Sequence, residues 1–114
     1  MPPKKNPLKL NKLQLRTLAL CQVLAADEDL ARIDEATGEA TLLQLPNPHG
    51  NHVHIGKFVV AARDASGFSN PAVWTALTRK GLVRRPDPLT VVLSAEGIAY
   101  DTGLADKFLA PSDH

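Results

Sequence analysis

The sequence has little of several features that would place it in a specialised class of protein. It contains a single cysteine, Cys21, so no disulfide can form within the chain. No apolar run approaches the length that a membrane span requires. The basic start, MPPKKNPLKLNK, lacks the apolar core and cleavage site of a secretory signal. These absences predict a cytoplasmic protein without a membrane segment.

Motifs for common enzyme chemistry are also absent. The sequence has no glycine-rich phosphate-binding loop, no Gly-x-Ser-x-Gly nucleophile elbow and no Cys-x-x-Cys pair. Cys21 lies within an apolar stretch, where a small buried side chain is expected rather than a nucleophile. We therefore expect a protein that is not an enzyme.

The net charge of +1 conceals a segregation of charge along the chain. Residues 1–26 carry five basic and no acidic side chains, residues 27–40 carry six acidic and one basic, and residues 57–85 carry six basic and one acidic. Such blocks can fold into a basic face beside an acidic one. A basic face suits nucleic acid if the two basic blocks meet in space. If they do not meet, the blocks are ordinary solvated surface.

The length of 114 residues suits one domain with one hydrophobic core. Residues 1–9 contain three prolines and three lysines, which predicts a flexible basic arm. We place a single domain at residues 10–110 and a disordered tail at residues 111–114.

The first half of that domain predicts a helix followed by a β-hairpin. Asn11 and Gln14 have the spacing of a capping box at the start of a leucine-rich helix. The acidic stretch ADEDLARIDEATG continues or follows this helix, which ends at Gly38. Two apolar stretches near residues 40–45 and 52–55 flank the turn formers PNPHGN, and we expect them to pair as strands.

The second half predicts two helices, two strands and a last helix. GKFVVAARDASG indicates a short helix ending at Gly67. Ser69 or Asn70 can cap the next helix, with Pro71 in its first turn, and Gly81 stops it after Lys80. LVRR and LTVVL are strands around a proline-bounded PDP turn. Ser94 caps a final helix with a partial apolar stripe. Trp74 and Leu77 should face the core.

The order of these elements resembles the winged helix-turn-helix domains of MarR-type bacterial regulators, over residues 10–100. The residues that carry the resemblance are Leu77, Lys80, Gly81, Leu82, Val83, Arg84, Arg85, Val91, Val92, Leu93, Ser94 and Gly97. LNKLQLRTLAL is similar to the first helix of that family. The resemblance implies an α+β fold: a winged helix-turn-helix with an extra β-hairpin before the second helix and a C-terminal helix. It also implies a small transcriptional regulator that binds double-stranded DNA. The expected form is a homodimer whose subunits contact each other through their first and last helices.

In a helix-turn-helix protein the second helix enters the major groove. The candidate DNA contacts are Asn70, Thr75, Arg79, Lys80, Arg84 and Arg85. Only Asn70 and Arg79 on that helix can form paired hydrogen bonds to a base, and PDP lacks the Asp-x-Arg of MarR-type wings. We therefore predict DNA binding mainly through phosphates, with strong salt dependence.

A histidine-rich segment, PHGNHVHIG, offers a second candidate site. His52 and His54 project from the same side of a strand because side chains alternate, and His49 can fold back from the loop. Imidazole groups are ligands for transition metals. The competing interpretation is that these histidines are polar, outward-facing neighbours of the core residues Val53 and Ile55. No other cofactor is expected.

Two alternatives to a DNA-binding regulator stay open at this level. The first is a winged helix that binds a protein partner through the apolar second helix or the hairpin, and ignores DNA. The second is a metal-responsive regulator that uses the histidine hairpin.

Overall fold

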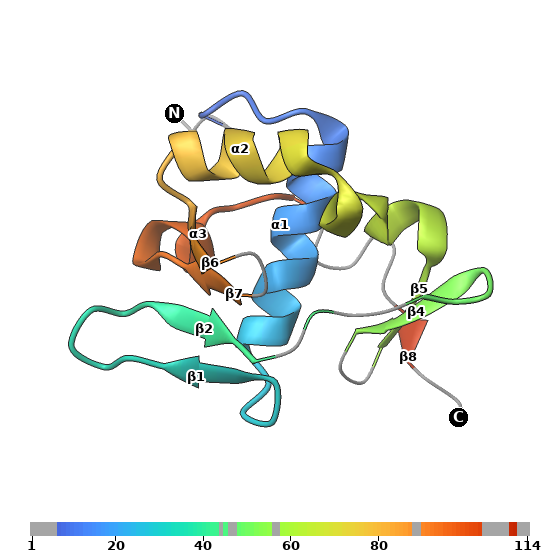
Figure 1. Ribbon diagram of the computed structural model, residues 1–114, viewed down its shortest axis with the longest axis horizontal. Coiled ribbons are helices and arrows are strands. Elements are labelled where there is room, and N and C mark those ends of the chain that lie inside the picture. Colours follow the sequence, from blue (N-terminus) through green and yellow to red (C-terminus); the bar gives the residue numbers. More distant parts are fainter. Residues whose placement is uncertain are drawn as a thin grey trace.

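The computed structural model describes residues 7–43, 45, 48–55, 58–87, 90–103 and 110–111. The elements are α1 (Lys12–Ala25), β1 (Ala31–Ile33), β2 (Ala40–Leu42), β3 (Pro48–His49), β4 (His52–Ile55), β5 (Phe58–Ala61), the 3-10 helix η1 (Ala62–Ser69), α2 (Pro71–Arg79), β6 (Val83–Asp87), β7 (Thr90–Leu93), α3 (Ala95–Ala99) and β8 (Ala110–Pro111). The described strands form two antiparallel four-stranded sheets, ordered β1-β2-β7-β6 and β3-β4-β5-β8. The fold is therefore of the α+β class. Figure 1 shows α1 between the two sheets.

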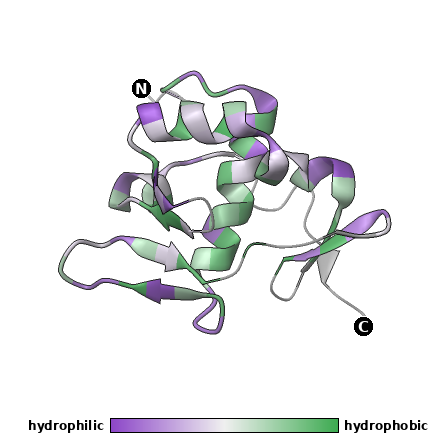
Figure 2. Ribbon diagram, viewed as in Figure 1, coloured by the Kyte–Doolittle hydropathy of each residue, from purple (hydrophilic) through white to green (hydrophobic). Residues whose placement is uncertain are grey.

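The predicted capping box at the start of α1 is confirmed. The Asn11 side chain accepts a hydrogen bond from the backbone N–H of Gln14 at 2.8 Å, and the Gln14 side chain accepts one from the backbone N–H of Asn11 at 3.0 Å. The two bonds satisfy two of the backbone donors that a helix start leaves unpaired. Apolar residues colour much of α1 in Figure 2, and Leu18 and Leu20 are fully buried.

The acidic stretch after α1 is a hairpin, so the prediction of a helix ending at Gly38 is wrong. α1 ends at Ala25, and β1 pairs with β2. The Asp34 side chain accepts from the backbone N–H of Ala36 at 2.9 Å, which closes a local turn. Gly38, with φ of 76°, belongs to this turn rather than to a helix end.

The predicted pairing of residues 40–45 with residues 52–55 is also wrong. β2 lies between β1 and β7, whereas β4 lies between β3 and β5. The turn formers close a tighter hairpin, in which His49 is paired with His52 across Gly50 and Asn51. Both segments do contain strands, and buried and half-buried residues alternate along β2 and β4. Alternation does not determine a strand's partner.

The stretch GKFVVAARDASG is only partly helical. Its apolar half is β5, in which Val60 is paired with Val53 of β4, and its polar half is η1. Gly67 does not end this helix but lies inside it, against α1. A side chain at this position would overlap the hydroxyl of the buried Thr17, so the glycine allows η1 to approach α1 closely.

The predicted second helix and the strands after it are confirmed. The Asn70 side chain accepts from the backbone N–H of Ala72 at 3.0 Å, Pro71 occupies the first turn, and Gly81 has φ of 77° beyond the helix end. β6 and β7 pair antiparallel, but β6 continues through Pro86 to Asp87, so these two residues of the predicted PDP turn belong to the strand. Trp74 is 6% exposed, which confirms that it belongs to the core.

The last predicted helix begins at Ser94, whose hydroxyl accepts from the backbone N–H of Gly97 at 3.0 Å. This helix, α3, ends at Ala99. Its expected apolar positions at 104, 108 and 109 lie outside the described residues, as do residues 1–6 of the predicted arm and residues 112–114 of the predicted tail. The backbone N–H of Leu8 donates to the Tyr100 hydroxyl at 3.1 Å, which ties the segment before α1 to the end of α3. No helix in the described ranges has the length and apolar character needed to cross a bilayer.

The fully buried thiol of Cys21 gives the core a dependence on pH. Burial raises the pKa of Cys21 far above that of a thiol in water, against a smaller opposing effect of Arg85. In the unfolded chain the thiol ionises at about pH 8.5. Below that pH the thiol is protonated in both the folded and the unfolded chain, so the contribution of Cys21 to stability is fully present. Above it only the unfolded chain loses the proton, and the free energy of unfolding should fall by about 1.4 kcal/mol per pH unit.

We expect the Cys21→Ala protein to lack this fall in the free energy of unfolding at alkaline pH. Urea titrations of both proteins at a series of alkaline pH values measure it as a difference. The cysteine protein should lose stability more steeply than the alanine variant. Parallel pH profiles would show that the buried thiol does not control alkaline stability.

Candidate nucleic-acid interface and the adjoining groove

The six predicted DNA contacts lie on α2 and β6 or at their ends, but Asn70 has a structural task. Its side-chain oxygen caps α2 through the hydrogen bond to Ala72. Paired readout of adenine needs both the oxygen and the nitrogen of an amide. The oxygen of Asn70 is already bound in the cap, and loss of that cap would cost about 1 kcal/mol.

Arg84 is held by a carboxylate from the acidic block. Its guanidinium donates from Nη2 to Glu39 Oε1 at 3.0 Å and from Nε to Glu39 Oε2 at 3.4 Å. The hydrogen bond with Glu39 raises the pKa of Arg84, which keeps the group charged. Glu39 lies just before β2, and 45 residues separate the pair in sequence. No local signal in the sequence could have indicated this partner.

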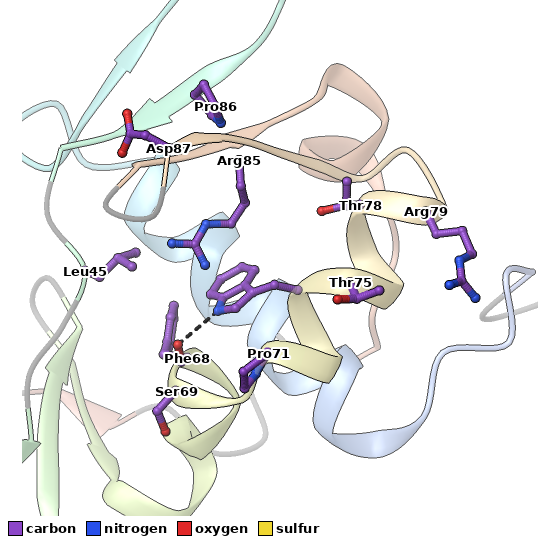
Figure 3. A pocket seen from close by; sticks show the side chains of 11 residues that line it. Leu45, Phe68, Ser69, Pro71, Thr75, Thr78, Arg79, Arg85, Pro86 and Asp87 are labelled. Atoms are coloured by element: carbon purple, nitrogen blue, oxygen red, sulfur yellow. Dashed lines mark hydrogen bonds between the residues drawn. The ribbon is translucent and has the colours of Figure 1, made fainter.

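Arg85 lies against the core tryptophan. Its guanidinium carbon is 5.0 Å from the centre of the Trp74 ring, and its Nε donates to the backbone oxygen of Thr90 at 3.2 Å. A cation over an indole face is an attractive arrangement. Figure 3 shows Arg85 extending from β6 into a groove beside α2.

The remaining candidates, Thr75, Arg79 and Lys80, are exposed on α2 and at its end. The segment before α1 runs alongside α2 in Figure 1, and it carries the exposed Lys9. Lys12 is exposed in the first turn of α1. Two cations of the first basic block, Lys9 and Lys12, therefore lie on chain segments that adjoin α2. Arg84 is instead directed to Glu39, in the hairpin formed by β1 and β2.

The predicted histidine site is only partly described. The rings of His52 and His54 are 5.1 Å apart and nearly perpendicular, so both side chains lie on the same side of β4, as expected. His49 is paired with His52 through the strand register, but its side chain lies outside the described part. Among the described residues, no three histidine, cysteine or acidic side chains are grouped to hold a metal ion.

The groove between α2 and β6 was not predicted. It has a volume of about 890 Å³ and is lined from η1 and α2 on one side and from β6 on the other (Figure 3). Trp74 lies at its floor, where the indole N–H donates to the backbone oxygen of Phe68 at 3.0 Å. The sequence indicated that this tryptophan is buried. It contained no sign that one edge of it closes a groove.

No protein-family model matches the sequence, and comparisons with curated proteins and with solved structures found no match. The geometry of α2, its cationic neighbours and the groove is therefore the basis for a functional proposal.

Proposed function

We propose that this protein is a winged-helix protein that binds double-stranded DNA, with α2 as the helix facing the DNA and the β6–β7 hairpin as the wing. The order of elements supports this. Helix α1 is followed by strands β1 to β5, and then η1 and α2 precede the antiparallel hairpin of β6 and β7. β2 completes a sheet with that hairpin through β7. In a helix-turn-helix protein the second helix of the motif enters the major groove, and α2 is the helix in that position.

The surface of α2 carries the proposal. From Ala65 to Pro86 the sequence contains no acidic residue. The exposed positions of α2 are Pro71, Ala72, Thr75, Thr78 and Arg79. A duplex with a charge on every phosphate therefore meets no carboxylate from this helix, and it meets cations at the C-terminal end of the helix.

The engaged side chains favour phosphate contacts over base recognition. Asn70 caps α2, Arg84 is paired with Glu39, and Arg85 is stacked on Trp74. Base readout needs side chains with paired donors or acceptors, and on α2 only Arg79 retains that capacity without losing a structural contact. We therefore propose binding with little preference for sequence, supported by Lys9, Lys12, Arg79 and Lys80.

A salt series of fluorescence anisotropy with several unrelated duplexes tests this function. If these four cations contact phosphates, the slope of log K against log salt should be about −3.6. The affinity should then fall by about two orders of magnitude between about 50 and 200 mM salt. Duplexes of different sequence should give similar slopes and affinities. The absence of binding to any duplex at the lowest salt would refute the function.

A further inference from the structure

The groove beside α2 has the size and lining of a small-molecule site. Its volume of about 890 Å³ lies within the range of about 300–1,000 Å³ that is typical of ligand pockets. Phe68, Pro71 and Trp74 contribute apolar surface from η1 and α2, and Pro86 contributes it from β6. Ligand sites commonly combine such apolar walls with a few polar groups in set positions.

The floor of this groove is already ordered. Trp74 is 6% exposed, its indole N–H is bonded to the Phe68 backbone oxygen at 3.0 Å, and the Phe68 and Trp74 rings are 5.8 Å apart. A ligand would not have to order these side chains. Pre-organised sites lose less free energy on binding for that reason.

A cation lies within this apolar lining. The Arg85 guanidinium is positioned by the indole face at 5.0 Å and by the Thr90 backbone oxygen at 3.2 Å from Nε. Arg79 lines the far end of the groove in Figure 3. Among the described lining residues Asp87 is the one carboxylate, and its side chain accepts from the Thr90 hydroxyl at 2.9 Å. The lining therefore has an excess of positive charge, which favours an anionic ligand.

We propose that the groove binds an amphiphilic carboxylate, with the carboxylate at Arg85 and an apolar chain along Phe68, Pro71 and Pro86. A planar guanidinium suits a carboxylate because the two groups can form paired, charge-assisted hydrogen bonds. An inorganic anion would leave the apolar walls in water. A peptide added as a further strand on β6 would find no N–H donor at Pro86.

The occupied groove would also change the surface that faces DNA under the proposed function. Thr75, Thr78 and Arg79 line the groove and are exposed on α2. A bound carboxylate adds negative charge beside this helix, so it should weaken DNA binding. Ligand binding itself does not depend on DNA and is tested without it.

Octanoate is a suitable probe because its carboxylate carries an unbranched apolar chain. Trp74 is the single tryptophan of the chain, so selectively excited indole fluorescence reports on the groove. We expect a saturable change with octanoate, and no comparable change with octanamide or acetate at the same concentration. An equal response to octanamide would show that the groove selects apolar surface only. An equal response to acetate, or no response to octanoate, would also overturn the proposal.

Variants test the role of the cation. Arg85→Gln should weaken octanoate binding about tenfold or more, because a hydrogen bond to a charged group contributes more than a neutral one. Asp87→Asn should bind octanoate at least as tightly as the parent. Arg63→Gln, which changes an exposed arginine on η1 outside the groove lining, should bind as the parent does. Unchanged affinity in a folded Arg85→Gln protein would overturn the proposal.

If Arg85→Gln does not fold, the parent protein still provides a test by NMR. Octanoate should shift the indole N–H signal of Trp74 and the backbone signals of Ser69 and Thr75, which line the groove. Shifts confined to residues outside the groove would place octanoate elsewhere and refute the assignment.

Discussion

Gly97→Ala should lower the free energy of unfolding by about 3 kcal/mol, which is the upper part of the usual range for overpacking. A Cβ atom at this position of α3 would overlap the backbone oxygen of Leu82. That oxygen accepts hydrogen bonds from the backbone N–H of Ser94 at 3.0 Å and from the Ser94 hydroxyl at 3.1 Å. The carbonyl therefore cannot move away without losing contacts that join α3 to the start of β6.

Urea denaturation of the parent and Gly97→Ala proteins measures this effect. Alanine is favoured over glycine in a helix by about 1 kcal/mol, so a loss of stability must come from the overlap. Gly50→Ala is the matched control, because its Cβ would meet open space. Because Gly50 has φ of 67°, Gly50→Ala should lower the free energy of unfolding by about 1–2 kcal/mol through backbone strain alone. A Gly97→Ala protein as stable as the parent would show that α3 can move away from β6.

Replacing Arg79 and Lys80 together by alanine should make the negative slope of log K for DNA against log salt shallower by about 2. Both side chains are exposed at the C-terminal end of α2, and neither takes part in the buried core. The loss should be similar for duplexes of different sequence, because phosphate contacts carry no sequence information. The matched control removes two exposed arginines elsewhere, Arg32 on β1 and Arg63 on η1, and should leave the slope unchanged.

Glu39→Gln should act in the opposite direction. It removes the carboxylate that holds Arg84 at 3.0 Å and leaves that arginine available to phosphate. We expect the magnitude of the salt slope to rise by about 1. Glu35→Gln, in the exposed turn of the same hairpin, is the control for removing one negative charge. Equal effects of the two glutamine variants would show that total charge, rather than release of Arg84, determines affinity.

The elements that could be predicted from the sequence are those specified by neighbouring residues. Asn11 and Gln14 start α1 because a capping box closes within one helical turn. Asn70 with Pro71 starts α2, and Gly81 ends it, for equally local reasons. Ser94 starts α3 in the same way. Each of these signals involves groups at most four residues apart, so it does not depend on how distant parts of the chain are arranged.

Contacts between distant residues were decided only by the tertiary structure. The apolar residues of β2 require that one face of the strand be buried, but they do not specify which strands lie beside it. In the structure β2 lies between β1 and β7, and Ala40 and Leu42 are buried there. The site follows the same division. The sequence by itself determined a helix α2 without acidic residues, followed by Arg84 and Arg85. The fold decided that Arg84 meets Glu39 and that Arg85 stacks on Trp74. Charge and hydrophobicity specify what kind of partner a side chain requires, whereas the path of the backbone determines which partner is within reach.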